Sequence, residues 1–288
     1  MAGALGGLGV SWRRVAAQEV AEVEAFLLAH IETSVFLVSN LRRFGPDGAD
    51  HPRAMTYWIT GDPVSGVIAQ SSAGVVMAQW PEADDWHAAV DILPHPITGA
   101  IGHGAQMNAM LRAAGIRDGV ANLDAAEVLY ALDLEALEVP NGVGTLRPLT
   151  EHDRTVVHPW RTDYAINILG EPEAKGPARA DAEISAYIEA DSHRLLVDGD
   201  APVSMTGFNA WVDDVVQVGG VYTPPALRGR GLARRAVALH LQAARAEGAR
   251  RAILFANDPS ALAAYEAIGF QPIGDFALIM FQDGQTPR

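Results

Sequence analysis

The chain has 288 residues, which is about the length of two ordinary domains. Apolar residues make up 49% and charged residues 19%, so the chain can bury a sizeable core and is not of the disordered or collagen-like class. It contains no cysteine, which excludes disulfides, thiolate catalysis and cysteine-ligated metal sites. The formal net charge of −14 argues against nucleic acid as the main partner.

No apolar run approaches the length that crosses a bilayer, so neither membrane insertion nor a membrane partner is expected. The first residues, MAGALGGLGVSWRR, have no basic segment before a short, glycine-broken apolar stretch, and we interpret them as a loose tail and not a signal peptide. The nine histidines show no metal-ligand spacing, so no metal is expected. Together these features predict a soluble cytoplasmic protein.

Apolar periodicity and turn residues predict alternating elements in the first half of the chain. The predicted helices cover 18–30, 35–43, 83–92 and 105–114, and the predicted strands cover 55–60, 64–70, 74–79, 97–101 and 128–134. The glycine- and proline-containing segment 139–143 is the predicted domain linker.

The second half repeats this rhythm. The predicted strands cover 145–148, 194–197, 203–209, 215–223, 252–255 and 276–281, and the predicted helices cover 151–169, 180–190, 231–247 and 260–268. A hairpin is expected around 198–200. Strands flanking helices, with an early antiparallel hairpin, predict a mixed α/β sheet, and two similar halves favour a tandem arrangement.

The segment 218–235 carries the strongest chemical signal, because a strand leads into a glycine-rich loop that opens directly into a helix. The N–H groups of a first helical turn have no intrahelical partner and lie at the positive end of the helix dipole. Gly229 and Gly231 let an anion approach the backbone, and Arg228, Arg230 and Arg234 add positive charge. This pattern predicts a pyrophosphate-binding site. The alternative reading of the arginine run is a solvated helix face.

Two short motifs give this segment a family resemblance. Arg228-Gly229-Arg230-Gly231-Leu232-Ala233 matches the pattern Q/R-x-x-G-x-G/A, and Tyr265-Glu266-Ala267-Ile268-Gly269-Phe270 matches Y-x-x-x-G-F. With these motifs the segment 144–281 resembles the GNAT superfamily of acyl-CoA-dependent N-acyltransferases. The resemblance implies the GNAT fold, in which two central strands splay into a V that receives the pantetheine arm of CoA.

The resemblance also implies a set of residues that bind acetyl-CoA, the acyl donor. The backbone of Val221 and Thr223 would pair with the pantetheine arm, and an N–H near Val221 or Tyr222 would stabilise the oxyanion. The pyrophosphate would lie on a phosphate loop formed by Arg228, Gly229, Arg230, Gly231, Leu232, Ala233 and Arg234. Asn257 would bond the arm, although the family places an asparagine where this chain has Asp258. The pair Gly219-Gly220 marks either a bulge in the strand or a close-packing site.

For catalysis the resemblance implies that Tyr265 protonates the departing thiolate; the alternative is an aromatic side chain that only packs. No general base is visible, because the strand 215–223 contains no carboxylate, and Asp213 and Asp214 fit a polar turn. The remaining candidates for the general base are a water relay or a group from the variable first helices. The segment 158–164, with Trp160, Asp163 and Tyr164, lies where relatives build the acceptor pocket, and Trp160 and Tyr164 are equally compatible with core or lid packing.

In the first half, the strand-to-helix junction 101–106 is expected at the position that the phosphate loop has in the second half. It has no Q/R-x-x-G-x-G/A pattern and no arginine cluster. We therefore interpret residues 1–138 as a degenerate GNAT-like domain that shapes or covers the acceptor site, and residues 144–288 as the catalytic domain. An ordinary crossover connection is the alternative.

These readings predict an N-acetyltransferase that moves an acetyl group from acetyl-CoA to a primary amine of a small molecule or peptide, by direct attack in a ternary complex. The alternative is a non-catalytic acyl-CoA-binding regulatory or interaction module. Transfer from an aminoacyl-tRNA is disfavoured by the net charge of −14. A homodimer is compatible with the sequence but does not follow from it, and the acceptor stays open because the fold does not determine it.

Overall fold

The computed structural model describes residues 11–48 and 50–288, so most of the predicted N-terminal tail lies outside the described residues. The chain forms two compact units. The first comprises Met1–Asp124 together with Phe276–Arg288, and the second comprises Ala125–Asp275. The segment 139–143, predicted as the linker, lies within the second unit.

The two halves of the sequence have the same succession of elements: a strand, two helices, three strands, a helix, a strand, a helix and a strand. The helices and strands expected from the sequence are present in this order, with bounds that differ at the ends. The structure therefore confirms a mixed α/β architecture with two similar halves in tandem, a repeat of structure that has no visible counterpart in the residues.

In its described residues, the first unit is a mixed sheet with four helices. Its strands follow the order β1 (Arg13–Arg14), β2 (Met55–Thr60), β3 (Gly66–Ser71), β4 (Val75–Gln79), β5 (Ile97–His103) and β12 (Gln271–Gln285). Its helices are α1 (Val20–Leu28), α2 (Ile31–Phe44), α3 (Trp86–Asp91) and α4 (Gly104–Ala113). Within this sheet β4 and β5 are parallel, and the other neighbouring strands are antiparallel.

The second unit repeats this plan. Its strands follow the order β6 (Ala121–Asp133), β11 (Arg251–Ala256), β10 (Val215–Tyr222), β9 (Ala201–Val212), β8 (His193–Asp198) and β7 (Thr145–Pro148). Its helices are α5 (Arg154–Asn167), α6 (Gly176–Glu189), α7 (Leu232–Ala246) and α8 (Pro259–Glu266). Here β10 and β11 form the parallel pair.

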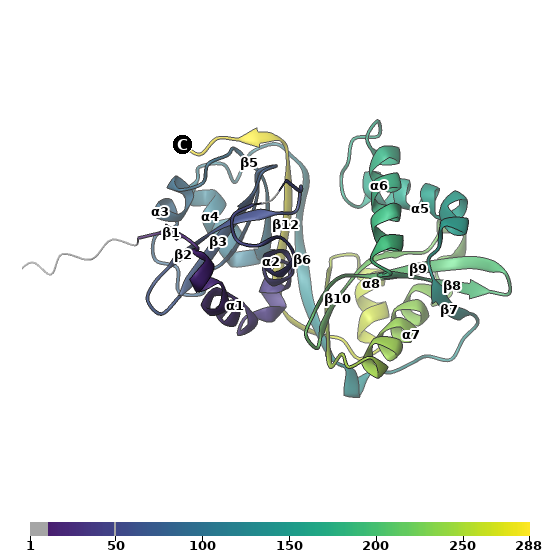
Figure 1. Ribbon diagram of the computed structural model, residues 1–288. Coiled ribbons are helices and arrows are strands. Elements are labelled where there is room, and N and C mark those ends of the chain that lie inside the picture. The colour runs from purple at the N-terminus through teal and green to yellow at the C-terminus, as the bar shows by residue number, and fades with distance from the viewer. Residues whose placement is uncertain (1–10, 49) are drawn as a thin grey trace, which may run out of the picture. The chain divides into compact units, whose positions relative to one another are not determined.

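Each unit receives its last strand from the other half of the sequence. Strand β6 ends the first half but pairs with β11 in the second unit, from Val128 opposite Ala256 to Asp133 opposite Arg251. Strand β12 ends the chain but pairs with β5 in the first unit, where the yellow strand lies beside β5 in Figure 1. The two units are therefore not consecutive pieces of sequence.

In the second unit, apolar side chains cover both faces of the sheet. Helices α7 and α8 pack on one face in a cluster that includes Val216, Val218, Val237, Leu241, Leu254 and Phe270. Helices α5 and α6 pack on the other face with Leu149, Val157, Ile184, Leu195 and Met205. Each such side chain contributes roughly 1.5–3 kcal/mol by leaving water. These two layers hold the parallel pair β10–β11 in place from both sides.

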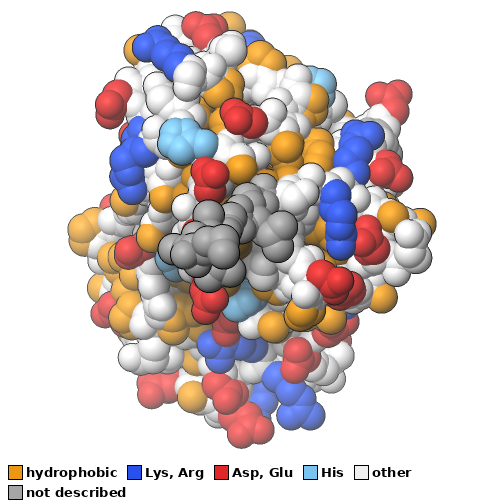
Figure 2. All heavy atoms as spheres, turned by 90° about the vertical axis from the view of Figure 1, so that its left-hand side faces the viewer, with side chains coloured by type: hydrophobic (Ala, Val, Ile, Leu, Met, Phe, Trp, Pro, Cys, Tyr) orange, Lys and Arg blue, Asp and Glu red, His pale blue; other side chains and the backbone are white. Residues whose placement is uncertain are grey.

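The surface carries charges of both signs. Lys and Arg side chains are interspersed with Asp and Glu side chains on the face shown in Figure 2. Within the described part of the chain, no helix combines the length and the apolar character that crossing a membrane requires.

Candidate active site

The parallel pairing of β10 and β11 stops halfway along both strands. Its register runs only from Val215 opposite Arg251 to Gln217 opposite Ile253. Beyond that point β10 stays paired with β9 as far as Tyr222, and β11 stays paired with β6 as far as Ala256. Within the described second unit the two strands therefore separate into the V that the family resemblance implies.

A bulge lies in β10 where it leaves β11. The register with β9 shifts between Gly219 and Tyr222, and Gly220 has a φ of +63°. A Cβ atom on Gly220 would lie 2.6 Å from Nε2 of His193, and one on Gly219 would clash with the side chain of Asn209. Both interpretations of the glycine pair hold, since it forms a bulge and also admits two side chains against the backbone.

The end of β10 is held by side-chain hydrogen bonds. The hydroxyl of Ser204 donates to the carbonyl oxygen of Tyr222 at 3.1 Å and lies 2.8 Å from the hydroxyl of Thr223. Nε of Arg228 donates to the carbonyl oxygen of Thr223 at 3.0 Å. Arg228 is thus fixed beside the strand, and its terminal nitrogens are the part of the side chain that would meet an anion.

Helix α7 begins without a side-chain cap. Gly231 is its N-cap residue in the left-handed region, with φ +72°, and no side chain hydrogen-bonds the first-turn amides. Gly229 also has a positive φ, of +76°. Arg230 is exposed, and no ion pair among the described residues includes Arg230 or Arg234. The phosphate loop therefore presents bare amides and two unpaired guanidinium groups, a combination suited to an anion.

The corresponding junction of the first unit lies between β4 and α3, because the two halves share one order of elements. The expectation that residues 101–106 hold that position is wrong: they join β5 to α4 and correspond to the junction between β11 and α8. The error arose because a local glycine pattern does not reveal how many strands precede it.

At its N-terminus α3 carries the carboxylate of Asp85, which accepts from the amides of His87 at 3.0 Å and Ala88 at 3.3 Å. The side-chain oxygen of Gln106 accepts from the amide of Trp80, directly after β4, at 2.6 Å. The first-turn amides, which have no side-chain partner in α7 of the second unit, are thus hydrogen-bonded in α3 of the first unit.

One arginine of α7 has a structural role. The guanidinium of Arg235 donates to the carbonyl oxygens of Pro140 at 2.6 Å, Val143 at 2.9 Å and Gly144 at 3.3 Å. It ties the predicted linker to α7. Leu232, which belongs to the predicted loop, is buried against Leu196 and Val203.

Tyr265 lies on α8 and is 9% exposed, with its ring edge-on to Phe270 at 5.9 Å between centroids. Burial raises the pKa of Tyr265 well above its ordinary value, so the phenol keeps its proton at neutral pH. The residue therefore packs in the core and at the same time retains the O–H that an acid needs.

Glu127 is a titratable group that the sequence analysis did not identify. It lies on β6 one residue beyond Val128, the last residue of that strand to pair with β11. Burial raises the pKa of this carboxyl, and its charge acts on the pKa of Tyr164 and of Tyr265. Its position in the first half of the sequence gave no sign that its charge would act on tyrosines of the second half.

The neighbours of Asn257 differ from the family pattern as expected. Asn257 follows β11 directly and is exposed. Asp258 caps α8, accepting from the amides of Ser260 at 3.0 Å and Ala261 at 2.9 Å and from the hydroxyl of Ser260. The bond from the Ser260 hydroxyl, together with the two amide bonds, lowers the pKa of its carboxyl. Asp258 thus replaces the family's asparagine with a helix cap.

Helix α5 brings polar and aromatic side chains to the end of β10. The hydroxyl of Tyr222 donates to Oδ2 of Asp163 at 2.7 Å, and the ring of Trp160 lies 5.9 Å from that of Tyr222. Burial and the Asp163 bond raise the pKa of Tyr222 to about 12. Asp213 and Asp214 form the turn between β9 and β10, as predicted, at the opposite end of β10 from the bulge.

Arg161 of the same helix is 1% exposed and forms an ion pair with Glu183 of α6. Its guanidinium lies over the ring of Tyr164, 4.2 Å from the centroid. The ion pair joins α5 to α6, because breaking it would leave an uncompensated buried charge. The contact of the guanidinium with its ring fixes Tyr164.

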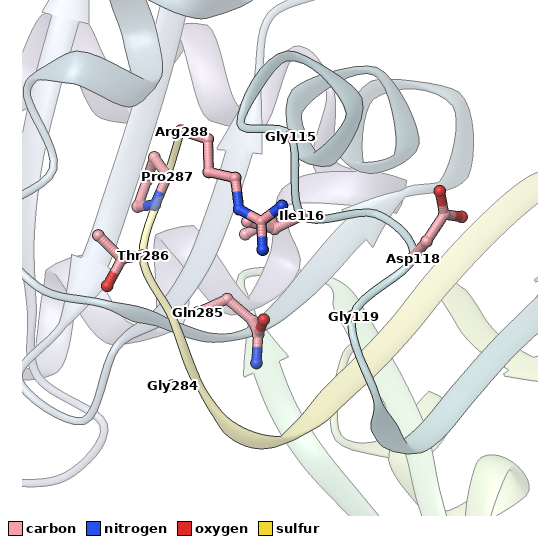
Figure 3. Close-up of a pocket in the computed structure, with 9 residues that line it drawn as sticks. All are labelled: Gly115, Ile116, Asp118, Gly119, Gly284, Gln285, Thr286, Pro287 and Arg288. Carbon is pink, nitrogen blue, oxygen red and sulfur yellow. The ribbon is translucent and has the colours of Figure 1, made fainter.

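A separate cavity of about 490 Å³ lies in the first unit between the loop after α4 and the end of β12 with the C-terminal residues (Figure 3). It is lined by Gly115, Ile116, Asp118, Gly119, Gly284, Gln285, Thr286, Pro287 and Arg288. None of these belongs to the predicted site. Among residues 11–48 and 50–288, no group of three or more His, Asp or Glu side chains is placed to hold a metal ion.

Comparisons with known proteins place this geometry in a family. Residues 157–270 match the model of the Acetyltransferase (GNAT) family. No curated protein sequence matches the chain significantly.

Among solved structures, a Drosophila protein aligns with a TM-score of 0.67 at 14% identity, over 96% of this chain and all of its own. A tandem GNAT protein from the clavulanic acid biosynthesis pathway aligns with a TM-score of 0.57 at 16% identity, over 94% of this chain and 97% of its own. A GCN5-related N-acetyltransferase from Kribbella flavida aligns with a TM-score of 0.57 at 18% identity, over 89% of this chain and 96% of its own. The chain therefore has the tandem GNAT fold, and residues 157–270 form a domain of the GNAT acetyltransferase family.

Proposed function

We propose that the protein is an N-acetyltransferase that moves an acetyl group from acetyl-CoA to a primary amine of a small molecule or peptide. The proposal rests on the family match of residues 157–270 and places both substrates at the V between β10 and β11. Transfer takes place by direct attack of the amine in a ternary complex, with no acyl-enzyme intermediate.

The observation that carries the proposal is the uncapped N-terminus of α7. Gly231 provides no side chain to its first-turn amides, whereas Asp85 provides a carboxylate to those of α3. A pyrophosphate is the natural partner for such amides beside Arg228, Arg230 and Arg234. The same contrast supports acetyl-CoA binding in the second unit and the view that the first unit has lost CoA binding.

The remaining donor contacts follow from the V. The backbone groups of Val221 and Thr223 would pair with the pantetheine arm, because β10 no longer pairs with β11 there. The N–H of Val221 or Tyr222 would stabilise the oxyanion that forms on the thioester carbonyl. Asn257, exposed at the end of β11, would bond the arm from the other side of the V.

Two groups suit the proton transfers. Glu127, with its raised pKa, would take a proton from the ammonium of the acceptor, which frees the nitrogen lone pair to attack the thioester carbon. When the tetrahedral intermediate collapses, the C–S bond breaks and Tyr265 would give its phenolic proton to the thiolate sulfur. The Tyr265 phenolate would then recover the proton that the nitrogen loses as it becomes the amide N–H. Both residues lie in the second unit and interact electrostatically.

Binding of acetyl-CoA is the first test. At 100 times its Kd, acetyl-CoA should add about 2.7 kcal/mol to the free energy of unfolding, seen as a higher melting temperature. Calorimetry should give one site per chain. An unchanged melting temperature at millimolar acetyl-CoA would rule out this donor, and two equal sites would contradict the assignment to the second unit.

Release of CoA in the presence of a panel of primary amines then tests transfer. The alternative function, a non-catalytic acyl-CoA-binding module, draws support from the burial of Tyr265 in an apolar cluster. Tight binding of acetyl-CoA without amine-dependent CoA release would favour that module.

A further inference from the structure

Asp163 is held beside the end of β10 by two neutral hydrogen-bond donors. The hydroxyl of Tyr222 donates to its Oδ2 at 2.7 Å, and Nδ2 of Asn167 donates to its Oδ1 at 2.7 Å. Trp160, Asp163 and Asn167 are three and four residues apart on α5, so their side chains share one face of the helix. Both carboxylate oxygens are thus fixed in place by donors that bring no charge.

Five other carboxylates of this helical layer are neutralised by arginine, whereas Glu173 and Glu189 take part in no ion pair found among the described residues. Glu151, Asp153, Glu171, Asp181 and Glu183 all form ion pairs with arginine side chains. None of the ion pairs found among the described residues includes Asp163, which is partly exposed. A carboxylate accepts about four hydrogen bonds, so Asp163 has acceptor capacity and an unneutralised charge left for a ligand.

We propose that Asp163 binds the ammonium group of the acceptor amine, with the Tyr222 hydroxyl and the Asn167 amide as positioning groups. This inference rests on the proposed function. Tyr222 stands between Val221 and Thr223, the two positions proposed for the CoA arm, so its bond to Asp163 places this carboxylate at the part of β10 where the donor is proposed to bind. The rings of Trp160 and Tyr222 provide an apolar wall for the carbon skeleton next to that ammonium.

The test uses two probes of matched shape, phenethylamine and 2-phenylethanol, which differ in one ammonium and one hydroxyl group. Their affinities are measured by calorimetry on the full chain, without CoA and with saturating CoA. We expect the wild-type protein to prefer the amine. Asp163→Asn should lower the affinity for the amine by about 10- to 100-fold, which is the effect of removing a charged hydrogen-bond partner. The affinity for the alcohol should not change.

The control is Asp181→Asn on α6, a carboxylate that is paired with Arg154 and 60% exposed. It should bind both probes as the wild type does. Tyr222→Phe, which keeps the backbone and the ring, should lower the affinity for the amine by about 5-fold, because the hydrogen bond that positions Asp163 is lost. The proposal that Asp163 binds the ammonium group would be overturned by equal wild-type affinity for the two probes, by no binding of either, or by an unchanged preference in Asp163→Asn.

Acetyl-CoA affinity of the same variants separates this inference from the function. If acetyl-CoA binds and the amine preference does not depend on Asp163, only the proposed role of Asp163 is wrong. If acetyl-CoA does not bind the wild type, the proposed function is wrong, and the measurements without CoA still decide whether Asp163 binds an ammonium group.

Discussion

The hydroxyl of Tyr130 donates a hydrogen bond to Oε1 of Glu266 over 2.7 Å. Tyr130 lies on β6, which the first half of the sequence contributes, and Glu266 lies on α8 next to Tyr265. The bond raises the pKa of Tyr130. The exchanged strand therefore does more than complete the sheet of the second unit, because it also fixes the helix that carries the proposed acid.

Tyr130→Phe tests that link. Tyr130 is 3% exposed, so the loss of its O–H leaves the Glu266 carboxylate without this donor, and we expect the free energy of unfolding to fall by about 0.5–1.5 kcal/mol. Urea titration measures the change. Tyr57→Phe removes a buried bond to the carbonyl of Leu37 in the first unit and serves as control. If α8 is positioned through Glu266, only Tyr130→Phe should also slow acyl transfer.

Gly231→Val tests the phosphate loop. A branched Cβ at a φ of +72° costs about 1–2 kcal/mol and places carbon atoms at the amides that would receive the pyrophosphate. We expect acetyl-CoA affinity to fall at least 10-fold. Gly248→Val is the matched control, since Gly248 has a φ of +111°, has open space around its Cβ position and lies beyond the other end of α7. Equal affinity losses in both variants would mean that strain, and not the loop, is responsible.

The sequence allowed the glycine loop before α7 and most elements to be predicted because their signals are local. Gly229, Gly231 and the periodicity of α7 sit within one short stretch, and β2 and β7 begin and end as predicted. The exchange of β6 and β12 could not be predicted, since strand pairing is decided by contacts between residues far apart in the chain. Glu127 was missed for the same reason.

The acceptor side shows the same division. Asp163 and Trp160 were expected near the acceptor because their segment lies where relatives build the acceptor pocket. Among the described residues, Asp163 differs from Asp181 and Glu183 in having no arginine partner, and this difference depends on the side chains that α6 places opposite α5. Such a difference in pairing is a property of packing and has no sequence pattern.

Glu127→Gln tests the proposed proton acceptor without a substrate. Burial raises the pKa of Glu127 above its ordinary value of 4.5, so the folded state binds this proton more tightly than the unfolded state does. The stability contributed by this group is therefore present below pH 4.5 and is lost as the pH rises through the folded-state pKa. The Gln variant lacks this loss, so its melting temperature relative to the wild type should increase from pH 4 to pH 7.

The exposed Glu135→Gln should follow the wild-type pH dependence. A Glu127→Gln melting curve that tracks the wild type at each pH would show that the carboxyl is not buried enough to act as proposed. In turnover, Glu127→Gln should lose the acidic limb of the kcat/KM profile, because that limb reports the essential base of the free enzyme.

Tyr265→Phe separates the enzyme from the module. The change removes one O–H and keeps the ring against Phe270, so the fold and the acetyl-CoA affinity should remain close to wild type. If the phenol protonates the thiolate, kcat should fall by about 10²- to 10⁴-fold, the usual value of general acid catalysis. The low end is expected, because a CoA thiolate is a tolerable leaving group. The loss should appear in kcat and not in the Kd for acetyl-CoA. The measurement pairs calorimetry with turnover of an amine that the wild type accepts, and Phe270→Leu controls for altered packing of α8. Wild-type turnover by Tyr265→Phe would leave Tyr265 a packing residue and remove the main catalytic argument against the module.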